Sequence, residues 1–222
     1  MILHKNIFAY LVSSSKLDVA VAFHTSNRVK PKVFKQIYQP FLISLFTDEE
    51  LNSGRLKVSL GYFTNNFKIV GNLDAYKNKA DYTAGVNKLP KTARAAKANG
   101  GNAFKKISKK VFNKKFGDRK DATNVVLLIT DDVSNVKPAT FVEEAASLRE
   151  TGAKIITVGL DKASSDELKV AATPGNKNVI MVNDYTDLSG ETLIQNIRTA
   201  LYIRKFKLMI IMIALTKIFL FN

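Results

Sequence analysis

The chain has 222 residues, and its 34 Lys and Arg against 19 Asp and Glu give a formal net charge of +15. Hydrophobic residues make up 46% of it and charged residues 24%, a composition typical of a folded core that excludes wholesale disorder. The absence of Cys excludes a disulfide framework, a thiolate nucleophile and a Cys-ligated zinc. With two His and no Gly-x-x-x-x-Gly-Lys pattern, the sequence offers no catalytic constellation, so we do not expect an enzyme.

The two ends differ from the middle of the chain. We expect one domain over residues 17–204, an N-terminal extension at 1–16, and an apolar C-terminal tail at 205–222 that is not part of the fold. The extension holds a short apolar stretch without a clear signal-peptide cleavage site. The apolar run of the tail is shorter than the roughly 20 residues that cross a bilayer.

Strands and helices alternate through the middle. The apolar run Leu17–Phe23 predicts a buried strand, followed by a polar loop at His24–Arg28. Further strands are expected at Arg55–Phe63, Phe67–Val70, Asn124–Thr130, Lys154–Val158 and Asn178–Val182, the first two as a hairpin. Helices are expected at Val33–Phe46 (kinked or shortened by Pro40), Asp74–Leu89, Pro138–Glu150, Ser165–Ala172 and from Leu188 to about Lys205.

This alternation favours an α/β fold with a doubly wound, mostly parallel six-stranded sheet, one antiparallel edge strand, and helices on both faces. Ligands of such sheets bind beyond the carboxyl ends of the strands. We therefore expect a functional edge built from the loops His24–Arg28, Gly100–Asn102, Asp131–Ser134 and Gly159–Asp161.

One segment carries most of the positive charge. Residues 77–120 contain 14 Lys and Arg against two acids, whereas residues 121–200 contain seven against 12. Phe104, Ile107 and Val111 fall near helical spacing, which predicts an amphipathic helix with lysines on its other faces. Its candidate binding residues are Lys105, Lys106, Lys109, Lys110, Lys114 and Lys115.

Two readings of these lysines remain open, a solvated helix face or a docking face for a polyanion. The polyanion could be an acidic matrix polymer, an anionic membrane or a nucleic acid. Nucleic acid is the weakest of the three because no aromatic residues of a recognition motif accompany the lysines.

Several stretches resemble a von Willebrand factor type A domain. They are Leu17–Phe23, Gly100-Gly101, Val126–Asp131, Ala145–Gly159 and Val179–Leu188. The resemblance implies a Rossmann-like fold. It also implies a possible metal-ion-dependent adhesion site, in which an Asp-x-Ser-x-Ser motif, a Thr and a second Asp bind Mg²⁺.

The match to that metal site is incomplete. His24 stands where the first Asp belongs, Arg28 replaces the second Ser, and Asn102 replaces the Thr; Ser26 and Asp131 match. A fixed guanidinium repels a cation and can pair with a carboxylate. We therefore expect no metal or other cofactor, an Arg28–Asp131 pair in its place, and His24 partly buried under the Gly100–Asn102 loop.

The resemblance implies a non-enzymatic adhesion module of an extracellular matrix that binds collagen or another matrix protein without a metal. The chain is similar in this to matrix modules of molluscan byssal threads and of collagen VI-type proteins. Two alternatives remain: an intracellular scaffold for complex assembly, and a membrane-peripheral protein that uses the basic helix and the apolar tail. The sequence does not set the oligomeric state.

Overall fold

The computed structural model describes residues 16–90 and 97–202. The apolar tail and, apart from Lys16, the N-terminal extension lie outside the described residues. Within the described part of the chain, no helix is both long enough and apolar enough to cross a membrane.

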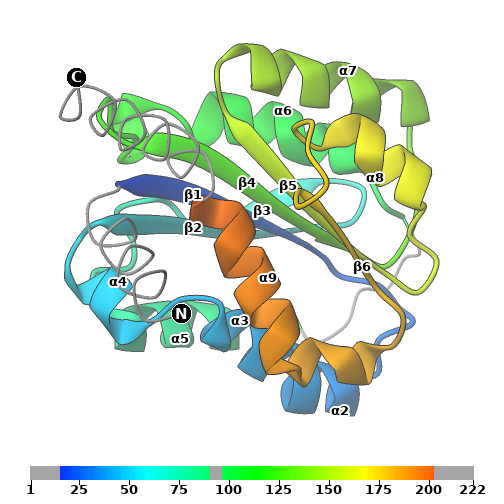
Figure 1. Ribbon diagram of the computed structural model, residues 1–222, viewed down its shortest axis with the longest axis horizontal. Helices are drawn as coiled ribbons and strands as arrows, with labels where there is room; N and C mark the ends of the chain where they lie inside the picture. Colours follow the sequence, from blue (N-terminus) through cyan, green and yellow to red (C-terminus); the bar gives the residue numbers. More distant parts are fainter. Residues whose placement is uncertain (1–15, 91–96, 203–222) are drawn as a thin grey trace, which may run out of the picture.

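A six-stranded sheet in the order β3-β2-β1-β4-β5-β6 forms the centre of the molecule (Figure 1). The strands are β1 (Leu17–His24), β2 (Leu56–Phe63), β3 (Phe67–Gly71), β4 (Thr123–Thr130), β5 (Lys154–Leu160) and β6 (Val179–Val182). All neighbouring pairs are parallel except β2 and β3. This confirms the predicted sheet with one antiparallel edge strand.

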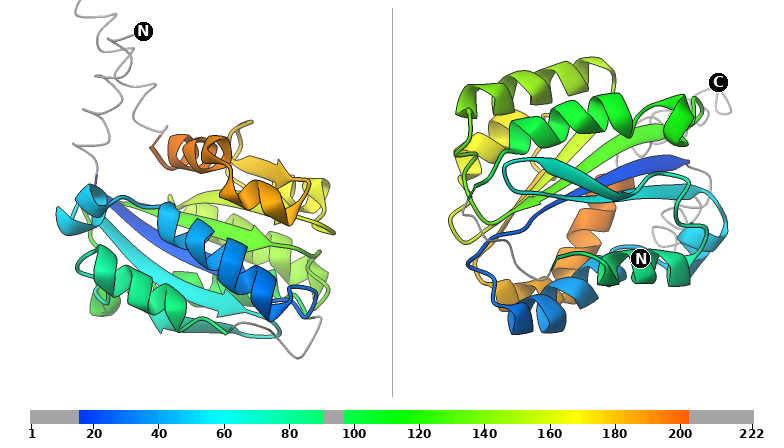
Figure 2. Two further views of the ribbon diagram at one scale, coloured as in Figure 1. Left: turned by 90° about the horizontal axis from the view of Figure 1, so that it is seen from below. Right: turned by 180° about the vertical axis from the view of Figure 1, so that it is seen from behind.

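Helices cover both faces of the sheet (Figures 1 and 2). One face carries α2 (Pro31–Val33), α3 (Gln39–Ser44), α4 (Asp48–Asn52), α5 (Lys79–Asn87) and α9 (Glu191–Tyr202). The other carries α6 (Gly100–Lys110), α7 (Pro138–Glu150) and α8 (Ser165–Ala171). Two short 3₁₀ helices, η2 (Lys114–Phe116) and η3 (Tyr185–Ser189), complete the connections.

The sheet separates two apolar cores. Val19 and Val21 of β1 belong to the core under α3, α5 and α9, whereas Ala20 and Ala22 belong to the core under α6, α7 and α8. Because both faces of β1 and β4 are covered, their sequences are almost continuously apolar.

Pro40 shapes the helical segment predicted over Val33–Phe46. The segment forms as α2, a π-helical turn η1 (Phe34–Tyr38) and α3. The Gln39 N–H donates to the Phe34 carbonyl, one residue before the proline that has no N–H to donate. The predicted kink is therefore a π-helical turn.

Three predicted boundaries were wrong. The lysine-rich helix does not carry all six predicted lysines: α6 ends at Lys110, and Lys114 and Lys115 belong to η2. Helix α5 begins after Asn78, whose side chain accepts from the N–H of Asp81, and not at Asp74. The final helix begins after η3 and not at Leu188.

The Gly100-Gly101 pair was expected in a loop but forms the first turn of α6. A Cβ on Gly100 would lie 2.5 Å from the ring of Phe141, and one on Gly101 would lie 2.8 Å from the backbone of Thr140. Both glycines are therefore needed for α6 to pack directly on α7.

Helix α4 was not predicted, although its first turn has the signature of a capping box. Glu50 Oε2 accepts from the N–H of Thr47 at 2.8 Å, and Thr47 Oγ1 accepts from the N–H of Glu50 at 3.2 Å. The same buried carboxylate accepts two bonds from Arg198, both 3.0 Å, and one from the Tyr202 hydroxyl at 2.5 Å. These contacts fasten α9 to α4.

Candidate functional site

The candidate site lies where the carboxyl ends of β1 and β4 meet. These strands are neighbours in the middle of the sheet, and strand order diverges on either side of them. This is the switch point at which open α/β sheets bind ligands. His24 is the last residue of β1 and Asp131 directly follows β4, and their side chains are 0% and 2% exposed.

His24 is held by acceptors on both sides of its ring. Nδ1 lies 2.5 Å from Asp131 Oδ1, and Nε2 lies 3.2 Å from the Lys97 carbonyl oxygen. Because both partners are oxygen acceptors, both contacts are hydrogen bonds when both ring nitrogens carry a hydrogen, as in the imidazolium. The ring stacks on Phe63 with centroids 5.1 Å apart. His24 thus covers one side of the Asp131 carboxylate from inside the protein.

Arg28 closes the outer side of the site. Its Nη2 donates to Asp132 Oδ2 at 2.7 Å, and its Nη1 donates to the backbone carbonyl of Asp131 at 3.1 Å. Burial opposes the charge, but the hydrogen bond and charge of Asp132, with the charges of Asp131 and Asp161, raise the pKa of Arg28.

The expected pairing of Arg28 with the Asp131 carboxylate was therefore wrong. His24 was expected in a loop, yet it extends β1, whose register sets Phe23 opposite Ile129 of β4. This register brings the His24 ring to the Asp131 carboxylate, and Arg28 pairs with Asp132 instead.

Asn102 does not contribute its side-chain oxygen to the site. Its Oδ1 accepts from the N–H of Phe67, the first residue of β3, at 2.8 Å. The connection before α6 contacts His24 through the Lys97 carbonyl, and the His24 side chain is fully buried. Ser26 is buried next to the site, and its Oγ accepts from the N–H of Arg28 at 3.0 Å.

Two tyrosines, Tyr38 and Tyr185, lie near Asp131 in the candidate site. The ring centroids of Tyr38 and Tyr185 are 5.6 Å apart, and the Tyr185 hydroxyl donates to Asp161 Oδ2 at 3.2 Å. Burial, with the negative charges of Asp131 and Asp161, raises the pKa of both tyrosines far above the usual range. Both phenols therefore stay neutral.

Glu167 of α8 supports the loop that follows β4. Both carboxylate oxygens accept from the N–H of Ser134, at 2.9 and 3.0 Å. Burial raises the pKa of Glu167; the Ser134 hydrogen bond opposes this, and the charge of Asp132 adds to it. Glu167 thus fixes the backbone next to Asp132.

The side chains present do not fit the Mg²⁺ site of the resembled family, because such a site needs several oxygen ligands. His24 supplies no oxygen, Arg28 adds a fixed positive charge, and the Asn102 oxygen is engaged elsewhere. Ser26 and Asp131 remain, with Asp131 Oδ2 buried and lacking a partner among the described residues. In the same part of the chain, no group of three or more His, Cys, Asp and Glu could hold a metal ion.

The lysines of α6 and η2 divide into two sets. Lys105 pairs with Glu144 of α7 at 3.2 Å, and Lys106 donates to the Phe67 carbonyl at 3.0 Å. The other four are exposed, namely Lys109, Lys110, Lys114 and Lys115. We call these four the exposed lysine set. Gly117, directly after η2, accepts from Lys57 near the amino end of β2, so the set lies far from the carboxyl edge.

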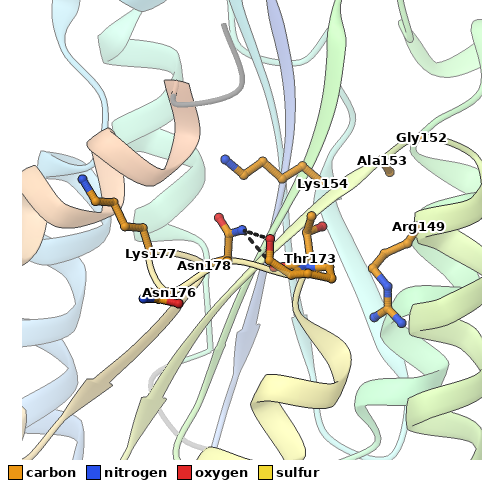
Figure 3. A pocket seen from close by; sticks show the side chains of 10 residues that line it. Arg149, Gly152, Ala153, Lys154, Thr173, Asn176, Lys177 and Asn178 are labelled. Atoms are coloured by element: carbon orange, nitrogen blue, oxygen red, sulfur yellow. Dashed lines mark hydrogen bonds between the residues drawn. The ribbon is translucent and has the colours of Figure 1, made fainter. Parts of the chain in front are cut away.

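A pocket of about 660 Å³ lies at the amino ends of β5 and β6 (Figure 3). Arg149 and Lys154 line it, but Arg149 donates to the Val170 carbonyl at 2.9 Å and Lys154 donates to the Ala200 carbonyl. Asn178 Nδ2 donates to the Thr173 carbonyl at 2.8 Å. These polar groups connect neighbouring elements and do not form a catalytic arrangement.

Sequence reasoning missed several contributors to the carboxyl edge. Asp132 was expected only as part of the loop Asp131–Ser134, and the sequence analysis did not single out Phe63, Lys97, Tyr38, Glu167 and Tyr185. The sequence signal for Asp132 is the adjacent carboxylate pair after a central strand. Lys97 acts through its backbone carbonyl, which no sequence pattern reveals.

A family model, von Willebrand factor type A domain, matches residues 18–196. The human collagen alpha-6(VI) chain is 29% identical over 156 residues, covering 67% of this chain and 7% of that one. Chicken matrilin-1 is 24% identical over 179 residues, covering 80% and 35%. The structure of proximal thread matrix protein 1 from the mussel byssus superposes with a TM-score of 0.73 at 24% identity, covering 82% of this chain and 46% of that one.

The chain belongs to the von Willebrand factor type A family. It spans a small part of each curated relative it matches, such as 7% of the collagen chain and 35% of matrilin-1. The mussel protein has also been solved with a zinc-occupied metal-ion-dependent adhesion motif.

Proposed function

We propose that this domain is a non-enzymatic adhesion module of an extracellular matrix that binds collagen or another matrix component without a metal. The observation that carries the proposal is the closure of the carboxyl edge. Two acidic side chains that could face a cation or a ligand are paired with His24 and Arg28 of the same chain. A partner that bound through a metal there would have to break the buried His24–Asp131 contact and the partly buried Arg28–Asp132 ion pair, which is costly.

Similarity to matrix proteins supports the matrix setting. Collagen alpha-6(VI), vitrin and matrilin-1 all match most of the domain. We infer an extracellular location from these names, and a protein partner from the family. Because the fold itself is shared by many functions, the binding experiment decides the proposal.

The exposed lysine set is the proposed contact surface for acidic groups on the partner. Within the described residues, Lys109, Lys110 and Lys114 are in no ion pair, so partner acids would meet no internal competitor. Attraction between exposed charges weakens once salt shortens the screening length to about 8 Å at physiological ionic strength. Binding through this surface should therefore fall as salt is raised.

The test is binding of the full 222-residue chain to fibrillar collagen, and to a matrix extract, with Mg²⁺ and with EDTA. We expect equal binding in both conditions and a loss with increasing salt. Loss of binding in EDTA would overturn metal independence. Absence of binding to either substrate would overturn the matrix assignment. Substituting the exposed lysine set by Gln then tests the surface, with Lys105→Gln/Lys106→Gln as the matched control.

A further inference from the structure

Strand β6 leaves one side of its backbone unpaired. It is the last strand of the sheet, and β5 is the one strand with which it pairs in the described part of the chain (Figure 1). The N–H of Thr157 in β5 donates to the Asn178 carbonyl at 2.8 Å, and Thr157 lies opposite Val179. In a parallel pair this register turns the backbone groups of Ile180 toward β5 and those of Val179 and Met181 outward. Among the described residues, no backbone group pairs with them on that side.

This edge lacks the usual protection. Natural edge strands carry Lys, Pro or inward charges that discourage pairing. The sequence of β6 is Val-Ile-Met-Val, without charge or proline, and the Met181 side chain is 42% exposed. The opposite edge strand, β3, carries an exposed lysine, Lys68. The two edges of one sheet therefore differ in whether they admit another strand.

A pocket lies next to β6 on each face of the sheet. On the α8 side, Val179 and Met181 border a pocket of about 410 Å³. On the η3 and α9 side, Ile180 and Val182 border a pocket of about 420 Å³. Side chains of an added strand alternate between the two faces, so each pocket can receive alternate residues.

We propose that β6 is a self-association edge, at which a second copy of this chain adds its own β6 in antiparallel register to join two sheets into one. Pairing Val179 of each copy with Met181 of the other satisfies the four outward backbone groups of each strand. Ile180 then faces its own counterpart on the two-fold axis as a non-hydrogen-bonded pair. The proposal does not depend on which matrix ligand the domain binds.

Charge favours a second copy at this edge. Residues 161–202 contain four Lys and Arg and six Asp and Glu, a net of 4 − 6 = −2, whereas the whole chain carries +15. Two copies therefore approach here without the repulsion expected elsewhere. Antiparallel pairing also sets the amino end of one β6, with Lys177, beside the carboxyl end of the other, with Asp184. Both residues are exposed, and neither forms an ion pair within the described chain.

The natural absence of cysteine allows a direct test by cross-linking. Two cysteines at a non-hydrogen-bonded antiparallel position have Cα atoms about 4.5 Å apart, within the range that a disulfide spans. We expect full-length Ile180→Cys to form disulfide-linked dimers on mild oxidation at a protein concentration on the order of 100 µM, since a four-residue strand gives weak association. Val142→Cys, on α7 with a 40% exposed side chain, is the matched control. Equal dimer yields from the two variants would overturn the proposal.

Two further variants in the Ile180→Cys background test the register. Met181→Pro removes an outward N–H without removing a bond to β5, and Lys177→Glu sets like charges beside Asp184. Each should lower the dimer yield several-fold while the melting temperature stays close to that of Ile180→Cys. Lys120→Glu makes the same charge change at an exposed residue away from β6 and should leave the yield unchanged. An equal change in dimer yield for Lys177→Glu and Lys120→Glu would show that the position of the charge relative to β6 does not matter. That result would contradict the antiparallel register.

Discussion

The carboxyl edge of the sheet and the lysine surface of α6 and η2 use charge in opposite ways. At the edge, the Asp131 and Asp132 carboxylates are engaged by His24 and Arg28 of the same chain. On the lysine surface, five of the six lysines are exposed, and of these five only Lys105 is in an ion pair within the described residues. The comparison teaches that the side chains at the switch point of the sheet are bound to one another, whereas Lys109, Lys110, Lys114 and Lys115 lie exposed away from it, where we propose that a partner binds.

The largest loss of stability should come from removing the His24–Asp131 contact at the carboxyl edge. Asp131→Ala removes the carboxylate that His24 contacts and leaves a buried ring without its partner. We expect the free energy of unfolding to fall by about 3 kcal/mol, which lowers the melting temperature by about 6–12 °C. Thermal and urea unfolding measure this. Asp131→Asn, which keeps an acceptor oxygen, should lose less; an unchanged stability in Asp131→Ala would show that the pair is not structural.

Substituting the exposed lysine set should change the free energy of unfolding little but weaken binding strongly. Replacing all four by Gln should weaken binding of a sulfated polysaccharide, used as a probe polyanion, by on the order of tenfold to a hundredfold at low salt. The stability should stay within about 0.5 kcal/mol of the parent chain. Salt-dependent affinity measurements check this. An equal loss in Lys105→Gln/Lys106→Gln would place the surface elsewhere on α6.

Rebuilding the edge should open it to a cation. The double substitution His24→Asp with Arg28→Ser gives the sequence Asp-x-Ser-x-Ser over residues 24–28, adds a carboxylate at residue 24 and removes the guanidinium of Arg28. We expect millimolar Mg²⁺ to raise the melting temperature of this variant by about 2–4 °C, an effect of about 1 kcal/mol, and EDTA to reverse it. The parent chain should not respond. A variant that folds but ignores Mg²⁺ would mean that the lost Thr ligand is decisive.

The smallest effect concerns pH. Burial raises the pKa of Glu167 above its usual 4.5, so folding favours the protonated carboxyl. The resulting stability is present below that pH and is lost as pH rises through the raised folded-state pKa. Glu167→Gln stays neutral and keeps an acceptor for Ser134, so it should remove this loss. Melting curves at about pH 4 and about pH 7 check the sign, with an expected change of a few degrees at most. A larger fall of the melting temperature between these two pH values in Glu167→Gln than in the parent chain would contradict this prediction.

The strands and the switch point could be predicted because their signals are periodic and local. β4 is apolar at nearly every position since both of its faces are covered, and Asp131 follows it directly. The boundaries of α6 could not be predicted in the same way. Gly100 and Gly101 are usual loop residues, and their place in a helix depends on the close approach of Phe141 and Thr140 from α7.

His24, Arg28 and Asp131 could be named as site residues from the sequence, but their pairings could not. The choice between Asp131 and Asp132 as partner of Arg28 depends on the register of β1 against β4 and on the extension of β1 through His24. Asn102 was placed at the site by analogy with a loop, whereas it lies on α6 and contacts β3. Whether the edge binds a metal stays a prediction.

The Glu50 contacts with Arg198 and Tyr202 have a consequence for synthesis of the chain. Glu50 is separated from these partners by 148 and 152 residues, so its hydrogen bonds with Arg198 and Tyr202 cannot form until α9 leaves the ribosome. Until then, closing the core under α3, α5 and α9 would bury the Glu50 carboxylate without its Arg198 partner, which is unfavourable. We therefore expect β1 and β2 to remain without their final packing during translation. The native fold should form only once α9 has been synthesised.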